Sequence, residues 1–261
     1  MNRKMGCLES PMDLRDYRVA KVVKTKIELP QEFELEPTAI KDQGSVGSCV
    51  AHAISSMLEK DGKSYSTGWI YGYRPDEYYQ GQGMYPREAL KTIKNLGAVK
   101  YKNFPYNIEM QQAKAMVDNR LETLKEYAQE KQILSYARLY SAQEIKEFLY
   151  QTKLPIPFAI TTYNYLELDE HDIILLPDRD AVATGSHMML IIGWNELGFI
   201  IQNSWGTDWG DNGLALLPYD YYINEAWGVT VEEEPIIVKP DFYWIRRIIQ
   251  IIINFIKNGL K

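Results

Sequence analysis

Hydrophobic residues recur at intervals of three and four along the first half of the chain, which is the spacing of one face of an α-helix. The clearest example spans residues 49–60, with apolar side chains at Val50, Ala53, Ile54, Met57 and Leu58. Ser48 precedes this pattern as a candidate N-cap, and Gly62 follows it. Cys49 is therefore predicted at a helix N-terminus, and similar patterns predict helices over 87–95 and 108–133.

The second half carries shorter apolar runs that are separated by turn residues, a pattern typical of β-strands. It predicts strands over 133–140, 156–163, 188–194, 198–203 and 213–217. One helix, over 141–151 with Ser141 as its N-cap, lies among them. A helix-rich part followed by a strand-rich part predicts an α+β protein with two lobes and a cleft between them.

Four segments follow from these patterns. Residues 1–29 show no sustained period and are predicted to be an N-terminal extension, 30–131 the helical lobe and 132–239 the β-rich lobe. The last segment, 240–261, contains an amphipathic helix over 241–258. At about 25 Å this helix is too short for a bilayer core of about 30 Å. The sequence leaves three alternatives open for this helix: packing on the body of the protein, binding to a membrane surface, or contact with a protein partner.

The composition, with 46% hydrophobic and 25% charged residues, is that of a globular protein and excludes a multi-span membrane protein. The net charge of −6, without a Lys/Arg block in the body of the chain, argues against a nucleic-acid partner. The start of the chain lacks the apolar run of a secretory signal, so we expect a cytoplasmic location, with peripheral membrane association through 241–258 as an option.

Cys7 and Cys49 are the only cysteines, so at most one disulfide can form and a reducing compartment is compatible. Cys7 lies in a stretch that we predict to be poorly anchored. The chain contains no CxxC, HxxxH or equivalent spacing of ligands. We therefore expect neither a metal site nor a cofactor.

Cys49 is the candidate nucleophile, because a thiol at a helix N-terminus faces unpaired N–H groups and the positive end of the helix dipole, which favour the thiolate. The alternative is a small buried apolar residue, since free cysteine is among the most buried residue types. Gln43 lies six positions upstream across a Gly-rich turn. Its amide and the Cys49 N–H are candidate donors of an oxyanion hole.

His187 and Asn203 lie on the two arms of a predicted hairpin, so the amide of Asn203 is expected beside the imidazole as a base and its orienting partner. His52 is one turn beyond Cys49 on the same predicted helix and is a weaker candidate base, because a base must lie opposite the nucleophile. His171 is expected in a solvated loop.

These residues belong to three blocks in which the chain resembles the papain family of cysteine peptidases, the C1 peptidases. Residues 43–49 match its Q-x(3)-G-S-C block, 185–194 its histidine block, and 203–213 its asparagine block. His187 follows Cys49 by 138 positions, within the separation known for papain and cathepsins. The resemblance spans about 29–222 and is strongest to the disulfide-free bacterial and phage-like members, because the Cys-Gly-Ser-Cys-Trp of secreted members is absent.

The resemblance implies a papain-like two-lobe α+β fold, with a helical left lobe and an antiparallel, β-barrel-like right lobe. It also implies a role for each matching residue: Cys49 as nucleophile, His187 as general acid and base, Asn203 as the residue that holds the imidazole, and Gln43 as oxyanion donor. For substrate binding it implies Trp205 over the His–Asn pair, Ala159 and Met188 in a side-chain pocket, and Gly83 and Met84 along the substrate backbone.

The resemblance therefore predicts a cysteine endopeptidase that cleaves polypeptides through a thioester. The alternatives are a peptidase-like binding module without activity, and an acyl transferase or ligase that uses the same thioester. Residues 1–29 are too few for the long pro-domain that inhibits many relatives. We nevertheless hypothesise that a short inhibitory segment lies within them.

Overall fold

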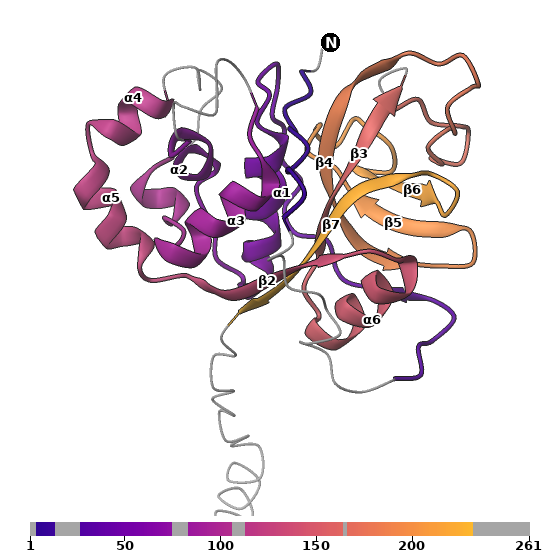
Figure 1. The fold of residues 1–261 in the computed structure, drawn as a ribbon, viewed down its shortest axis with the longest axis horizontal. Coiled ribbons are helices and arrows are strands. Elements are labelled where there is room, and N and C mark those ends of the chain that lie inside the picture. The colour runs from indigo at the N-terminus through magenta and orange to yellow at the C-terminus, as the bar shows by residue number, and fades with distance from the viewer. Residues whose placement is uncertain (1–3, 14–26, 75–82, 106–112, 164–165, 232–261) are drawn as a thin grey trace, which may run out of the picture. The chain divides into compact units, whose positions relative to one another are not determined.

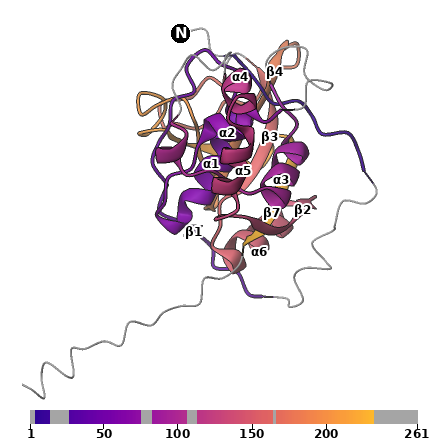
Figure 2. The same ribbon diagram turned by 90° about the vertical axis from the view of Figure 1, so that its left-hand side faces the viewer.

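The computed structural model of the chain describes residues 4–13, 27–74, 83–105, 113–163 and 166–231. Most described helices gather on one side of this part of the chain, and the strands lie on the other together with the helix labelled α6 (Figure 1); Figure 2 faces the helical side. Helix α1 (Cys49–Leu58) faces strand β4 (Ala183–Trp194) where the two sides meet. The α+β class and the papain-like two-lobe arrangement predicted from the sequence are confirmed.

The other described helices are short and mostly amphipathic. They are α2 (Thr67–Gly72), α3 (Pro86–Asn95), α4 (Ala113–Asp118), α5 (Leu121–Ala128) and α6 (Ala142–Thr152), with 3-10 turns at Glu59–Asp61 and Tyr101–Asn103. The helices predicted over 87–95 and 141–151 correspond to α3 and α6. Ser141 caps α6 as expected, because its hydroxyl accepts the N–H of Glu144 at 3.1 Å.

Helix α1 is buried along its whole length, and this placement fixes Cys49 at its first position. The chain continues as a 3-10 turn and reverses at Gly62, whose φ of 77° is the left-handed value that favours glycine. Ser48 occupies the N-cap position, but its side chain does not cap the helix. Its hydroxyl instead lies 3.2 Å from Nδ1 of His52, one turn further on.

The single helix predicted over 108–133 is wrong, because the described part of this range forms two helices with a break at Arg120. The two helices pack on different partners. Val117 of α4 lies against Gly72 of α2, and the carbonyl of Ala128 at the end of α5 lies against Gly97. One straight helix cannot meet both. Residues 106–112 lie outside the described part of the chain.

Helix α2 was not predicted. It has only six residues, two of them glycine, so it carries no amphipathic repeat. Ser66 begins it by accepting the N–H of Trp69 at 3.0 Å. The N-cap residue Ser66 is therefore the sequence feature that indicates this helix, because the helix has no periodic pattern of apolar residues.

The strands of the described residues form one seven-stranded antiparallel sheet, in the order β2-β7-β3-β4-β5-β6 with β1 paired to β4. Besides β4, they are β1 (Phe33–Glu34), β2 (Ile133–Leu139), β3 (Ile156–Tyr163), β5 (Gly198–Gln202), β6 (Leu214–Pro218) and β7 (Ile223–Val231). Strand β4 begins five residues before its predicted start, so His187 lies inside the strand. Strand β7 was not predicted, although it joins β2 to β3.

The expectation that the N-terminal stretch is poorly anchored is wrong for residues 4–13. Cys7 is only 6% exposed, and its N–H donates to the carbonyl of Ser186 at 3.1 Å. The indigo ribbon of this segment runs between α1 and β4 (Figure 1). Tertiary contacts rather than local periodicity hold it, and a sequence pattern does not report such contacts.

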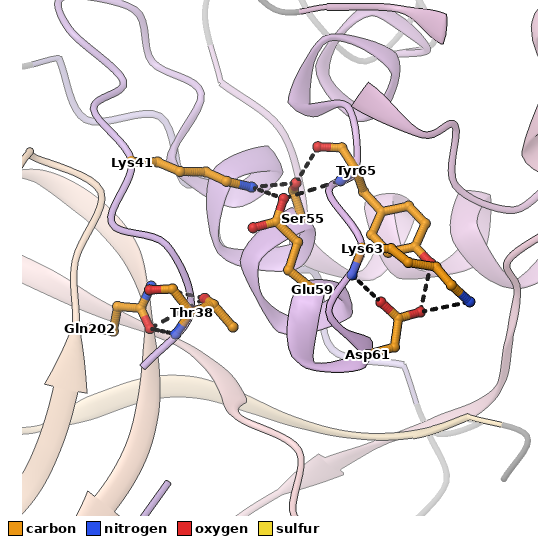
Figure 3. A network of polar contacts seen from close by, with 8 residues as sticks. All are labelled: Thr38, Lys41, Ser55, Glu59, Asp61, Lys63, Tyr65 and Gln202. Atoms are coloured by element: carbon orange, nitrogen blue, oxygen red, sulfur yellow. Dashed lines mark hydrogen bonds and ion pairs between the residues drawn. The ribbon is translucent and has the colours of Figure 1, made fainter. Parts of the chain in front are cut away.

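A buried polar network holds the stretch that leads to the nucleophile loop (Figure 3). The ammonium of Lys41 lies 2.8 Å from the carboxylate of Glu59 and donates to the hydroxyl of Ser55 at 2.6 Å. Burial lowers the pKa of Lys41, and the negative charge of Glu59 opposes that shift. Thr38 and Gln202 exchange hydrogen bonds across to β5, so the stretch is fixed to both sides of the fold.

Among the residues that the structure describes, no helix combines the length and apolarity of a membrane span. The helix predicted over 241–258 lies outside the described residues, which end at Val231. Its three alternatives therefore remain predictions.

Candidate active site

The N-terminus of α1 brings Cys49 to the strand that carries His187. Helix α1 packs on β4, and Cys49 is the first residue of the helix. The backbone of Met188, the residue after His187, is hydrogen-bonded to the Cys49 thiol. The elements that carry the thiol and the imidazole therefore come from opposite sides of the fold and pack against each other.

The loop before α1 is joined directly to the loop that contains Asn203. Gln43 N donates to Ser204 O at 2.9 Å, and Gly206 N donates to Lys41 O at 3.0 Å. The side chains repeat this link, because the hydroxyl of Ser204 donates to Oε1 of Gln43 at 2.8 Å. Because the Ser204 hydroxyl fixes the amide oxygen of Gln43, the orientation of the amide is set and its N–H groups point away from Ser204.

The two N–H bonds of the Gln43 amide have different partners. One donates to Val46 O at 2.9 Å, within the Gly-rich turn. The other donates to Lys4 O at 3.2 Å, in the N-terminal segment. This side chain is fully buried, and it holds a peptide carbonyl of the N-terminal segment, which is the kind of contact expected of an oxyanion-hole donor.

His187 and Asn203 form the predicted pair. Nε2 of His187 lies 2.8 Å from Oδ1 of Asn203, and the backbone N–H of Ser204 donates to the same oxygen at 2.7 Å. Two donors that converge on one atom identify it as the amide oxygen, so Nε2 carries hydrogen. In the neutral ring Nδ1 is then the basic nitrogen.

Trp205 covers this pair. Its ring stacks on His187 with centroids 4.7 Å apart and planes inclined by 29°. Trp209 meets Trp205 edge-on at 5.7 Å. The stacked indole keeps water from the His187–Asn203 hydrogen bond, which strengthens that bond because the surroundings have a low dielectric.

The expectation that the helix N-terminus favours a Cys49 thiolate is not met in this state of the cleft. Cys49 is fully buried, and burial raises the pKa of its thiol. Backbone hydrogen bonds from Met188 and Gly6 act in the opposite direction but do not outweigh burial. Gly6 of the N-terminal segment contacts the thiol and takes part in this burial, and an inhibitory segment within residues 1–29 was hypothesised from the sequence.

Residues 4–8 occupy the cleft as an extended peptide. Met84 N donates to Gly6 O at 2.9 Å, and Leu8 N donates to Met84 O at 3.1 Å, so Cys7 forms a parallel bridge with Met84. The predicted backbone-binding residues Gly83 and Met84 therefore bind a backbone, which is that of the chain itself. The residues just before Gly83 lie outside the described part of the chain.

Glycines allow this close approach. A side chain at Gly6 would overlap the carbonyl of Gly47, in the turn before Cys49. A Cβ at Gly83 would lie 3.0 Å from the carbonyl oxygen of Gly6, and one at Gly185 would lie 2.6 Å from Cβ of Met5. The segment and the cleft therefore fit backbone to backbone.

Ala159 and Met188, the predicted pocket residues, are cross-strand neighbours and fully buried. Glu225 of β7 lies opposite Ala159 on the other side and was not predicted. It is only 2% exposed, and its carboxylate accepts the N–H of Ser10 at 3.0 Å and the indole N–H of Trp227 at 2.8 Å. The sequence alone did not indicate Glu225, because its place opposite Ala159 depends on strand β7 and on the register of β7 with β3.

The remaining histidines lie where the sequence placed them. His52 is buried between the two sides of the fold, and its Nδ1 is 2.9 Å from Ser48 O. Burial lowers its pKa to about 4, so it is neutral near pH 7. His171 is exposed, and its N–H donates to Asp169 at 2.9 Å within a turn.

A cavity of about 680 Å³ lies away from this constellation. It is bordered by Glu9–Asp13, the end of β2, the start of α6 and the start of β7. None of the predicted site residues lines it. Its position fits a cleft whose central part, beside Cys49, is already filled by residues 4–8.

Comparison with known proteins identifies relatives of this arrangement. The sequence pattern of the papain family of cysteine proteases matches residues 29–230. A peptidase C1-like protein of Acanthamoeba polyphaga mimivirus is 24% identical over 91% of this chain and 90% of its own length. A cysteine protease of Blomia tropicalis is 27% identical over 74% of this chain, which spans 62% of that protein.

Solved structures share the fold. Xylellain, a cysteine protease from Xylella fastidiosa, superposes with a TM-score of 0.73 at 22% identity, covering 89% of this chain and 97% of its own. The bromelain protease from Ananas comosus, solved in complex with the E64 inhibitor, gives a TM-score of 0.57 at 20% identity, covering 78% and 100%. At these identities the likeness supports the fold alone.

Proposed function

Because the chain belongs to the papain family of cysteine proteases, we propose that it is an endopeptidase that uses Cys49, His187 and Asn203, and that it is latent while residues 4–8 fill the cleft. The observation that carries this proposal is the bound segment itself. The groups predicted to receive a substrate, Gln43 and Met84, already hold a peptide. A cleft that binds an extended peptide beside a cysteine and a histidine is suited to peptide-bond hydrolysis.

In the proposed mechanism His187 first takes the proton of the Cys49 thiol. Asn203 holds the hydrogen of Nε2, so the lone pair of the neutral ring is on Nδ1. The thiolate attacks the carbonyl carbon of the substrate. The N–H of Cys49, at the open end of α1, and the Gln43 N–H that now holds Lys4 O stabilise the oxyanion.

Collapse of the tetrahedral intermediate breaks the peptide bond. His187 gives its proton to the leaving amine and remains neutral, and the acyl group stays on Cys49 as a thioester. Water then loses a proton to His187 and attacks the thioester. The released thiolate and the imidazolium complete the cycle. The alternative of an inactive binding module is not favoured, because Cys49, His187, Asn203 and Gln43 are all present.

The bound segment is an inhibitor rather than a substrate in this proposal. The backbone of Gly6 is hydrogen-bonded to the Cys49 thiol, so the segment occupies the place next to the sulfur that a substrate would take. Ser10 fastens the far end of the segment, since its N–H donates to Glu225 and its hydroxyl accepts the N–H of Arg87 at 3.2 Å. The segment therefore blocks the cleft and is fastened on both sides of Gly6.

Labelling with an epoxide of the E-64 type tests the proposed nucleophile. We expect covalent labelling of the full-length protein at Cys49, located by peptide mapping, and hydrolysis of an unstructured protein that stops when labelling is complete. Cys49→Ala should abolish both, whereas Cys7→Ala should keep labelling at Cys49. Labelling elsewhere, or hydrolysis that survives Cys49→Ala, would exclude this nucleophile.

A further inference from the structure

The cleft brings the only two cysteines of the chain into the same site. Cys49 is at the N-terminus of α1, and Cys7 is in the segment that lies on it. Both are free thiols and both are buried. The mechanism proposed above uses Cys49 alone, so it leaves Cys7 without a role.

Backbone contacts place Cys7 beside the nucleophile. Its own N–H donates to Ser186 O, next to His187, and the preceding Gly6 packs against Gly47, two residues before Cys49. Consecutive Cα atoms are 3.8 Å apart, and a disulfide needs Cα atoms roughly 4.4–6.8 Å apart. Cys7 directly follows Gly6, whose backbone is hydrogen-bonded to the Cys49 thiol, so the two cysteines lie in the same part of the cleft and the segment must shift to bring their sulfurs together.

We propose that Cys7 and Cys49 form a reversible disulfide that fastens residues 4–13 in the cleft, so that the peptidase is locked under oxidising conditions and released by thiols. This inference rests on the proposed role of Cys49 as the nucleophile. The reaction needs two small-molecule reactants: a peroxide that oxidises the thiols and a low-molecular-weight thiol that reduces the disulfide.

The chemistry requires both states of the segment. When the segment lifts, Cys49 becomes accessible to solvent, and its thiolate attacks hydrogen peroxide, giving a sulfenic acid and hydroxide, which takes up the thiol proton to become water. When the segment returns, the Cys7 sulfur attacks the sulfenic sulfur and releases a second water. The sum is two thiols and one peroxide converted to one disulfide and two waters.

Electrostatics keeps this pair unreactive in the closed state. Burial is the main cause that raises the pKa of the Cys7 thiol well above its ordinary value, and the neighbouring Cys49 raises it further. Burial likewise raises the pKa of Cys49. The reduced, closed form is therefore protected, and Cys7 acts as the resolving cysteine that intercepts oxidised Cys49 before irreversible oxidation.

Peroxide treatment of the full-length protein tests this pairing. We expect non-reducing peptide mapping to find the Cys7–Cys49 cross-link, and activity lost to peroxide to return with dithiothreitol. Cys7→Ser should form no cross-link, and its loss of activity should persist after dithiothreitol because Cys49 proceeds to sulfinic acid. Met12→Ala, at a 91% exposed position of the same segment, is the matched control and should behave as the wild type.

Two results overturn the inference: no cross-linked peptide in the oxidised wild type, or equal recovery of wild type and Cys7→Ser. The mapping does not depend on catalysis. A cross-link in a protein whose reduced form neither binds the epoxide nor hydrolyses protein would confirm the thiol pair and contradict the proposed function, so the two failures are distinguishable.

Discussion

In this cleft, hydrogen bonds to neighbouring residues decide which atoms of Gln43 and His187 can face a substrate. The oxygen of the Gln43 amide is taken by Ser204, so its nitrogen must face the substrate position. The hydrogen on Nε2 of His187 is taken by Asn203, so its basic nitrogen is on the other side of the ring. The sequence blocks indicated Gln43, His187 and Asn203, because each block carries its chemistry within a few positions, but they did not indicate that Ser204 positions Gln43.

Gln43→Ala should lower kcat by roughly 10²- to 10³-fold, because one of two oxyanion donors is lost. Ser204→Ala removes only the hydroxyl that orients the Gln43 oxygen, so we expect a smaller loss than in Gln43→Ala. Steady-state kinetics on a peptide substrate compares the two. An equal loss in both variants would mean that Gln43 acts only as a structural residue.

His52 makes stability depend on pH. Its pKa in the folded protein is about 4, below the ordinary 6.5, so between these values the unfolded chain binds more protons than the folded one. The free energy of unfolding should therefore fall as pH is lowered from 6.5 to 4, by about 3 kcal/mol from this residue. His52→Asn, which retains a donor toward Ser48 O, should flatten this dependence in urea unfolding.

If the wild type and His52→Asn lost the same free energy of unfolding over this pH range, the buried neutral state of His52 would be refuted. Glutamate and aspartate residues titrate in both proteins, so the difference between them isolates the histidine.

At the scale of elements, prediction followed periodicity. Helices α3 and α6 and strands β2 to β6 were predicted because each carries a clear apolar repeat or cap. The break at Arg120 and the anchoring of residues 4–13 were missed, since packing partners far away in the sequence determine both. Strand β7 was also missed, and with it Glu225.

The N-terminal segment depends on Gly6 for its place in the cleft. Gly6→Ala puts a methyl group into the carbonyl of Gly47, so the segment must leave the cysteine. We expect E-64-type labelling of Cys49 to become faster than in the wild type, by at least an order of magnitude if lifting the segment limits access. The measurement is the rate of labelling followed by mass spectrometry.

Met12→Ala, in the same segment but exposed, should label at the wild-type rate. If Gly6→Ala labelled no faster than Met12→Ala, residues 4–8 would not be what limits access to Cys49.

In the described molecule, a buried ion pair ties the stretch before the nucleophile loop to the residue that follows α1. Lys41 and Glu59 are 20% and 8% exposed, and removal of the ammonium leaves the carboxylate buried without a counter-charge. Lys41→Met should therefore lower the free energy of unfolding by about 3 kcal/mol. The surface pair Lys125–Glu122 provides the control, because Lys125→Met should change it by less than about 1 kcal/mol.

Urea unfolding of the two lysine variants decides this point. Similar losses in both would mean that the Lys41 network does not hold the stretch before the nucleophile loop. This network could not be predicted from the sequence. Lys41 and Glu59 are 18 positions apart, and their contact depends on how the chain enters and leaves α1.

The most direct test of the central claim is hydrolysis of an unstructured protein by Gly6→Ala and by the double variant Gly6→Ala/Cys49→Ser. We predict that the first hydrolyses the protein faster than the wild type, because its cleft is open, and that the second has no activity. Activity that persists in the double variant, or an open variant without any activity, would contradict a latent cysteine peptidase centred on Cys49.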